Sequence, residues 1–199
     1  MTVSVSMPKG LSAFLDALKP GGRHNLYSAA ANAVRILVRG HLAREATLRH
    51  SSAKKLAATP TGHLAKAARA TVFHADEFGG EVIIPAAGIN RAFHDVTITP
   101  NAAHDLTIPI NKLSYGRRAK ELRALGWKFF TPPEGHDKED ILFGYRGKGK
   151  NREVVPLYLL KKRVQQRQDR SLLPSDAEIS STASRAVMSY LQLVSRKAS

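Results

Sequence analysis

The chain has 199 residues, of which 31 are Lys or Arg and 16 are Asp or Glu, so its formal net charge is +15. It has no cysteine, which excludes disulfides, thiolate catalysis and cysteine-rich zinc sites. No run approaches the roughly 18 apolar residues that mark a membrane span, and no basic segment followed by a long apolar one opens the chain. We therefore expect a folded protein with no membrane partner, made in the cytoplasm, whose basic surface attracts nucleic acid or an acidic protein.

Residues 1–24 are expected to form an N-terminal arm. They combine a short helical segment, LSAFLDALK, with PGGRHN, in which Pro20 and the two following glycines are typical of a helix end. From Asn25, which can serve as an N-cap, apolar residues recur at helical spacing and predict one long helix. Gly40 is expected to weaken the middle of this helix, and it would also permit the close approach of another backbone.

The next segments change from helical to extended patterns. Residues 51–61 are expected to form a mobile connection, because they are rich in Ala, Lys, Ser and Thr and end near Pro60 and Gly62. A short helix follows at His63, and β-branched stretches at 81–89, 91–100 and 104–110 predict antiparallel strands.

The central part of the chain predicts a short helix between strands. In YGRRAKELRALGW, Leu122 belongs to the inner stripe, and Gly126 takes the position after the helix end that favours a left-handed backbone. WKFFT resumes strand character, and a hairpin follows the loop PPEGHDKED. Pro156 interrupts the second hairpin strand, which indicates an edge position or a bulge.

The C-terminal segment predicts the clearest helix. Ser175 and Glu178 have the spacing of a capping box, and an apolar stripe runs from Ile179 to Val194. The elements together predict an α+β fold over residues 25–199 as a single domain. In this fold an antiparallel sheet packs against a long N-terminal helix and a C-terminal helix, and a basic hairpin projects from it.

Candidates for catalysis are few. HADEF places His74, Asp76 and Glu77 together, which allows a hydrolase reading, but a solvated helix terminus explains the same residues. No metal motif, nucleophile elbow or phosphate-binding glycine loop is found. We assign no catalytic, cofactor-binding or metal-binding residue and expect no cofactor and no enzyme activity.

The stretch FGYRGKGKNREVV, residues 143–155, is expected to be the projecting hairpin, with Gly147 and Gly149 in its turn. Cations are concentrated in and after it, and two acids, Glu153 and Asp169, accompany them as far as Arg170. The candidate contact residues for nucleic acid or for assembly are Arg146, Lys148, Lys150, Arg152, Lys161, Lys162 and Arg163.

Three readings of this basic region stay open. Lysines and arginines can neutralise phosphates without reading a base sequence, which would make the protein a sequence-independent nucleic-acid-binding module. They can equally bind an acidic protein, or form only a solvated hairpin tip. Stacking aromatics are scarce nearby in the sequence, where only Tyr145 and Tyr158 are close.

Several short segments follow one another in a distinctive order over about 100 residues of the chain. They consist of Thr97, Ile98 and Pro100, then Leu106, Thr107, Ile108 and Pro109, then Tyr115, Gly116, Arg117, Arg118 and Ala119, then Tyr158, Leu160 and Val164, and finally Leu173, Pro174 and Asp176. In this order the chain resembles tailed-bacteriophage virion morphogenesis proteins of the tail-completion, or neck, type.

This resemblance implies a structural virion protein without catalytic residues. Its copies would form a ring, expected to be a hexamer, at the head–tail junction, with genome DNA passing through the ring. Its partners would be other copies of itself, the connector or head-closure protein, and the tail terminator or tail tube protein. The hairpin would then serve assembly, with contact to phage DNA as an added role.

Overall fold

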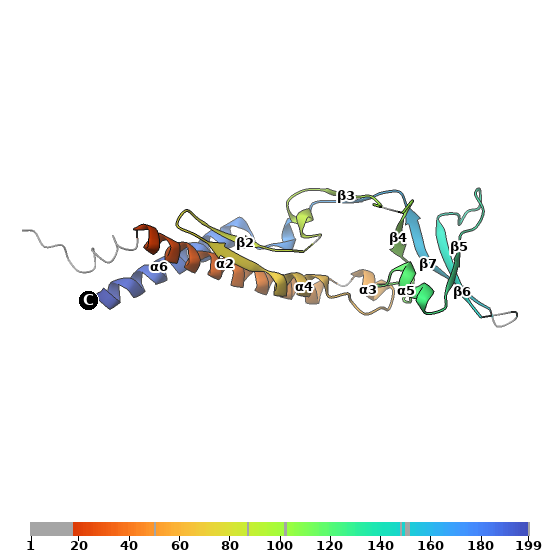
Figure 1. Cartoon of the computed structure of the whole chain (residues 1–199), viewed down its shortest axis with the longest axis horizontal. Coiled ribbons are helices and arrows are strands. Elements are labelled where there is room, and N and C mark those ends of the chain that lie inside the picture. Colours follow the sequence, from red (N-terminus) through yellow and green to blue (C-terminus); the bar gives the residue numbers. More distant parts are fainter. Residues whose placement is uncertain are drawn as a thin grey trace, which may run out of the picture. The chain divides into compact units, whose positions relative to one another are not determined.

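The computed structural model describes residues 18–49, 51–86, 88–101, 103–147, 149 and 152–198. The LSAFLDALK segment lies outside these residues except for its last two. The elements are helices and antiparallel strands (Figure 1), which confirms the predicted α+β class.

The sequence predicts a single domain over residues 25–199, whereas the structure divides into two compact units. Unit 1 takes the described parts of Met1–Thr47, His63–Ala92 and Asp169–Ser199, and unit 2 takes those of Leu48–Gly62 and Phe93–Gln168. Each unit has its own buried apolar cluster. The pattern of apolar residues predicts that helices and strands will bury one face, but it does not tell which elements share a core.

Helix α2, Pro20–Leu48, is the longest element of unit 1. It begins five residues before Asn25, so the predicted helix end at Pro20 and the predicted cap at Asn25 are wrong. Proline suits the first turn of a helix, because its φ is already helical and its missing N–H has no partner to lose there. A Cβ added at Gly40 would meet no atom within 4 Å, so the close approach expected at this glycine is absent among the described residues.

A β-hairpin packs on α2. Its strands β1, Val72–Ala75, and β2, Gly80–Ile83, pair antiparallel and lie alongside the helix in Figure 1. A Cβ at Gly80 would lie 3.0 Å from both Ala31 Cβ and the Tyr27 carbonyl oxygen, so the missing side chain lets β2 approach α2. Strand β1 occupies a segment that the sequence analysis interpreted as a helix terminus, and that interpretation is wrong.

The core of unit 1 forms where α2 meets shorter elements. Val38 and Leu42 of α2 are buried with two alanines of α4, His63–Ala70, and with Ile89 of the 3₁₀ helix η1, Ile89–Ala92. The second 3₁₀ helix, η3, Arg170–Leu172, precedes Leu173, which packs against the same cluster.

Helix α6, Asp176–Ala198, begins with the predicted capping box. The Ser175 backbone N–H donates to Glu178 Oε2 at 2.9 Å, and the Glu178 N–H donates to Ser175 Oγ at 3.3 Å. The predicted apolar stripe is half-buried, while Met188 and Leu193 are more than half exposed. None of the described residues of α6 is fully buried, so the helix presents apolar surface to solvent.

The capping box is expected to weaken in acid. The hydrogen bonds from the Ser175 backbone and hydroxyl hold the pKa of the Glu178 carboxyl below its usual 4.5. Because the folded pKa is the lower one, the stabilisation is complete above about pH 4.5 and is lost as the pH falls through the folded value. Amide hydrogen exchange at the start of α6, measured from pH 6 to pH 3, should accelerate in this window. A Glu178→Gln variant should show a smaller change, and an equal change in both proteins would contradict the assignment.

Unit 2 is built on a four-stranded antiparallel sheet with the order β4-β7-β6-β5. Its strands are β4, Leu106–Pro109, β5, Lys128–Phe130, β6, Ile141–Arg146, and β7, Glu153–Lys161. A separate pair joins β3, Val96–Ile98, to β8, Val164–Gln166. The strands expected at 81–89, 91–100 and 104–110 are confirmed in shortened form as β2 of unit 1 and as β3 and β4 of unit 2.

Two short helices complete unit 2. Helix α5, Ala119–Ala124, buries Leu122 completely and is followed by Gly126 with φ +86°, as predicted. Helix α3, Ser51–Lys55, lies in the expected mobile connection and buries Ala53. The connection therefore contains ordered helical structure that its composition did not indicate.

The Pro156 position is a bulge on an interior strand. Leu142 lies opposite Tyr158 and Phe143 lies opposite Pro156, so Leu157 is the extra residue on β7. Leu157 and Tyr158 consequently both enter the core, where they are 0% and 1% exposed. The bulge is confirmed, while the alternative edge position is excluded because β7 lies between β4 and β6.

Candidate functional site

The predicted basic hairpin is formed by β6 and β7, which pair antiparallel up to Arg146 and Glu153. Gly147 and Gly149 both have positive φ, as the predicted turn requires. Lys148 and Lys150 lie outside the described residues.

The described cations of this region do not form one cluster. Arg146 and Arg152 lie at the turn end of the hairpin, whereas Lys161, Lys162 and Arg163 lie at the other end of β7. A nine-residue strand spans about 30 Å at the usual rise per residue. The two groups of cations therefore lie at opposite ends of β7 and do not form one basic patch.

Several of these cations already have acidic partners in the same unit. Arg146 lies 3.9 Å from Glu153, Lys161 Nζ lies 3.1 Å from Asp140 Oδ2, and Lys162 Nζ lies 3.0 Å from Asp105 Oδ1. Such exposed pairs add little stability, about 0 to 1 kcal/mol each. They do reduce the positive potential available to phosphates, so this region attracts nucleic acid less than its sequence suggests.

Aromatic rings lie beside the hairpin in a way that the sequence analysis missed. Phe130 of β5 stacks on Phe143 of β6 with centroids 5.5 Å apart and lies 6.0 Å from the Tyr145 ring. Arg152 lies over the Tyr145 ring at 4.0 Å. Pairing of β5 with β6 brings Phe130 to these residues, and the alternation within ILFGYR was the available signal for an aromatic face.

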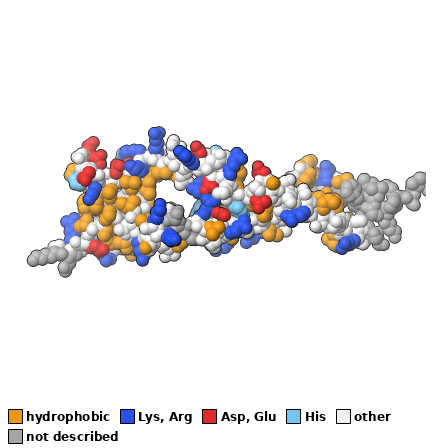
Figure 2. All heavy atoms as spheres, turned by 180° about the vertical axis from the view of Figure 1, so that it is seen from behind, with side chains coloured by type: hydrophobic (Ala, Val, Ile, Leu, Met, Phe, Trp, Pro, Cys, Tyr) orange, Lys and Arg blue, Asp and Glu red, His pale blue; other side chains and the backbone are white. Residues whose placement is uncertain are grey.

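These rings belong to one face of the sheet, which we call the outer face. The strand register places on it Phe130, Phe143, Tyr145, Val154 and Pro156, with Lys128 opposite Tyr145. Phe130 is 38% exposed, Val154 is 46% exposed and Pro156 is also exposed. Figure 2 shows hydrophobic side chains gathered over this sheet, at the left of the view, with basic and acidic side chains around them.

The opposite face of the sheet contains the core of unit 2. Leu122 of α5 packs there with Trp127, Leu157 and Tyr158. Tyr158 donates its hydroxyl to the Arg117 carbonyl at 3.0 Å, and burial raises the pKa of this hydroxyl above its usual value. The helix therefore covers one face of the sheet, and the outer face is left with an apolar, aromatic surface.

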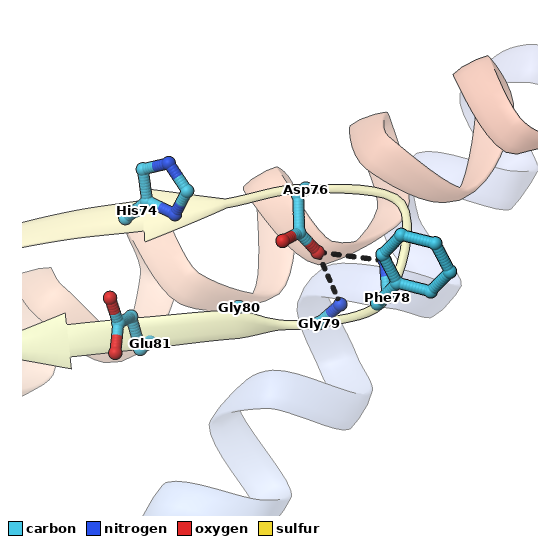
Figure 3. Close-up of a pocket in the computed structure, with 6 residues that line it drawn as sticks. All are labelled: His74, Asp76, Phe78, Gly79, Gly80 and Glu81. Atoms are coloured by element: carbon cyan, nitrogen blue, oxygen red, sulfur yellow. Dashed lines mark hydrogen bonds between the residues drawn. The ribbon is translucent and has the colours of Figure 1, made fainter.

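The hydrolase candidates belong to the β1–β2 hairpin of unit 1, with His74 on β1 and with Asp76 and Glu77 in the turn that follows. Two of them, His74 and Asp76, line a shallow hollow (Figure 3). The Asp76 carboxylate accepts hydrogen bonds from the backbone N–H groups of Phe78 at 2.7 Å and Gly79 at 2.8 Å. These bonds lower the pKa of Asp76 below its usual 3.8. Asp76 thus organises the turn, and its geometry does not favour a role as a catalytic base.

Among the residues that the structure describes, no three His, Asp or Glu side chains come together in a way that could hold a metal ion. The described helices also include none with the length and apolar character needed to cross a membrane.

Comparison of the chain with protein-family models, with curated proteins and with solved structures gives no match. The outer face of unit 2 is the strongest candidate site among the described residues.

Proposed function

We propose that the protein is a structural virion subunit of a tailed phage, which forms a ring, expected to be a hexamer, at the head–tail junction. Its partners in this role would be other copies of the chain, the connector or head-closure protein, and the tail terminator or tail tube protein. The protein would be made in the host cytoplasm and then reside in the virion.

The observation that carries the proposal is the outer face of unit 2, whose apolar residues are exposed in the part of the chain that the structure describes. Exposed contiguous apolar surface with a polar rim is typical of a protein interface, because water contact with such surface is unfavourable. Phe130, Val154 and Pro156 give this face its apolar surface, and Lys128 and Arg152 give it a basic rim. Aromatic residues and arginine are enriched at the energetic centres of interfaces.

The charge arrangement supports assembly over nucleic-acid binding as the main role. Arg146, Lys161 and Lys162 lie near acids of the same unit, so they are less available to phosphates. The resemblance of the ordered segments to tail-completion proteins supports the same assignment. Passage of DNA through the ring would still bring phosphates close to the subunits.

The test is a complementation experiment with phage particles made without the protein. We expect heads and tails to remain separate in electron micrographs and to join when the unmodified chain is supplied. A Phe130→Asp, Val154→Asp chain should fold, as judged by circular dichroism, yet fail to restore joining. Lys120→Asp on α5, an exposed position away from the outer face, is the matched control and should restore it. Normal joining in the absence of the protein would refute the proposal.

Sequence-independent binding of nucleic acid is the second candidate, and one observation favours it. Arg152 on Tyr145, beside Phe130 and Phe143, combines a cation with stacked rings, as many single-strand-binding surfaces do.

This candidate predicts affinity for DNA that falls steeply with salt. Changing Lys148, Lys150 and Arg152 together to Ala should abolish binding in a filter or anisotropy assay. The change of Lys112, Lys120 and Lys138 to Ala removes the same charge elsewhere in unit 2 and should have a much smaller effect. Equal losses of DNA affinity in the two variants would show that binding depends on the net charge of the protein and not on the hairpin, which would contradict this candidate.

A further inference from the structure

The tip of the β1–β2 hairpin holds an aromatic ring away from the protein. Phe78 is 79% exposed, the highest exposure of any large hydrophobic residue that the structure describes. Figure 3 shows its ring at the tip of the hairpin, beyond the ends of both strands.

The turn that carries Phe78 is well ordered by its own hydrogen bonds. Besides accepting from Phe78 and Gly79, Asp76 donates its backbone N–H to the Gly79 carbonyl at 2.9 Å. An exposed ring on a preorganised turn loses little conformational freedom when it binds, which is a favourable property for an interface anchor.

Acidic residues lie along the hairpin that carries this ring. Asp76 and Glu77 directly precede Phe78 in the chain, and Glu81 lies on β2 opposite His74, where it is exposed. The hairpin end therefore combines an exposed aromatic ring with three acidic residues of the same hairpin, in a chain whose net charge is +15.

The outer face of unit 2 has the complementary chemistry. Its centre is aromatic and apolar, and its rim carries Lys128 and Arg152. A ring placed on Phe130 and Val154 would bury apolar surface, while the carboxylates near Phe78 would approach the cations of the rim.

We infer that the hairpin tip of one copy docks on the outer face of unit 2 in a second copy. This inference rests on the proposed function and specifies the contact between subunits. The two surfaces differ, so the contact is heterologous, and repeating it from copy to copy closes a ring when the rotation permits.

Single-cysteine variants test the contact without background, because the chain has no cysteine of its own. A Phe78→Cys chain and a Val154→Cys chain, carrying different affinity tags, are mixed and oxidised. We expect a disulfide-linked heterodimer, since a disulfide requires the two Cα atoms to come within about 7 Å. Phe78→Cys mixed with Ala124→Cys, an exposed position on α5, should give no such product. Absence of the first heterodimer over the whole accessible concentration range overturns the inference.

A double Phe78→Cys, Val154→Cys chain separates contact between copies from contact within one chain. Under dilute oxidising conditions we expect this chain to stay reduced as a monomer. A disulfide formed inside single chains would overturn the inference, because the tip would then reach its own outer face.

Charge exchange provides an independent readout in sedimentation experiments. Glu81→Lys and Lys128→Glu should each cause loss of the self-assembled species, and an equimolar mixture of the two should partly restore it, because one copy then presents opposite charges to the other. Assembly unchanged in both single variants overturns the inference and leaves the proposed function intact. A confirmed contact together with normal head–tail joining in particles lacking the protein would overturn only the proposed function.

Discussion

Replacing Gly144 by alanine is expected to lower the free energy of unfolding of unit 2 by about 1 to 3 kcal/mol, the usual cost of overpacking a core. A Cβ at this position would overlap Leu157 Cδ1 and lie 3.1 Å from Trp127 Cε3. Leu157 is completely buried, so it can move only by displacing other core atoms. Trp127, the single tryptophan, is 4% exposed in the same core, and its fluorescence during urea unfolding reports the change.

A double-mutant cycle tests the cause of this loss. In a Leu157→Ala background the overlapping atom is gone, so the Gly144→Ala change should cost much less there than in the unmodified protein. The same cost in both backgrounds would show that the Leu157 overlap is not responsible. The result also bears on function, because the bulge that brings Leu157 and Tyr158 into the core sets the register of the outer face on the opposite side.

Replacing Leu42 by alanine is expected to destabilise unit 1 by about 2 to 5 kcal/mol, through lost burial and the cavity left behind. Leu42 is 0% exposed and packs with Val38, Ala67 and Ile89. Far-ultraviolet circular dichroism during urea unfolding follows the loss of α2. Faster amide hydrogen exchange in α2 would show that the loss of stability is located in unit 1.

Ile36→Ala is the matched control for Leu42→Ala. Ile36 lies on the same helix but is 58% exposed, so its truncation should change stability by no more than about 0.5 kcal/mol. Comparable losses for the two variants would mean that the α2 face towards α4 and η1 is not the buried one.

The sequence predicted well wherever a local rule decides the structure. The capping box at Ser175 and Glu178, the helix stop at Gly126 and the bulge at Pro156 follow from backbone hydrogen bonding and allowed dihedral angles of neighbouring residues. Hydrophobic periodicity predicted α2 beyond Asn25 and most of the strands, because the spacing of apolar residues along a short segment follows the repeat of a helix or a strand. The start of α2 at Pro20 was missed because proline is compatible with both a helix end and a helix start.

The candidate site could be predicted only in part. The hairpin and its turn glycines were visible, since glycines between two strand-like runs are a local signal. The ion pairs of Lys161 with Asp140 and of Lys162 with Asp105 join residues far apart in the chain, so counting charges along the sequence overestimated the free basic surface. Phe130 stacks on Phe143 because β5 pairs with β6, and this pairing could not be inferred from the separation of the two residues in the sequence.

By itself, the sequence determined the charge, the absence of cysteine chemistry, the α+β class, the start of α6 at its capping box and the end of α5 at Gly126. Only the tertiary structure decided that the elements form two units, and that β5, β6 and β7 expose an aromatic face, on the side opposite α5, among the described residues. The physical reason is the range of the interactions. Caps, turns and periodicity act over a few residues, whereas burial and strand register depend on segments that the chain brings together from a distance.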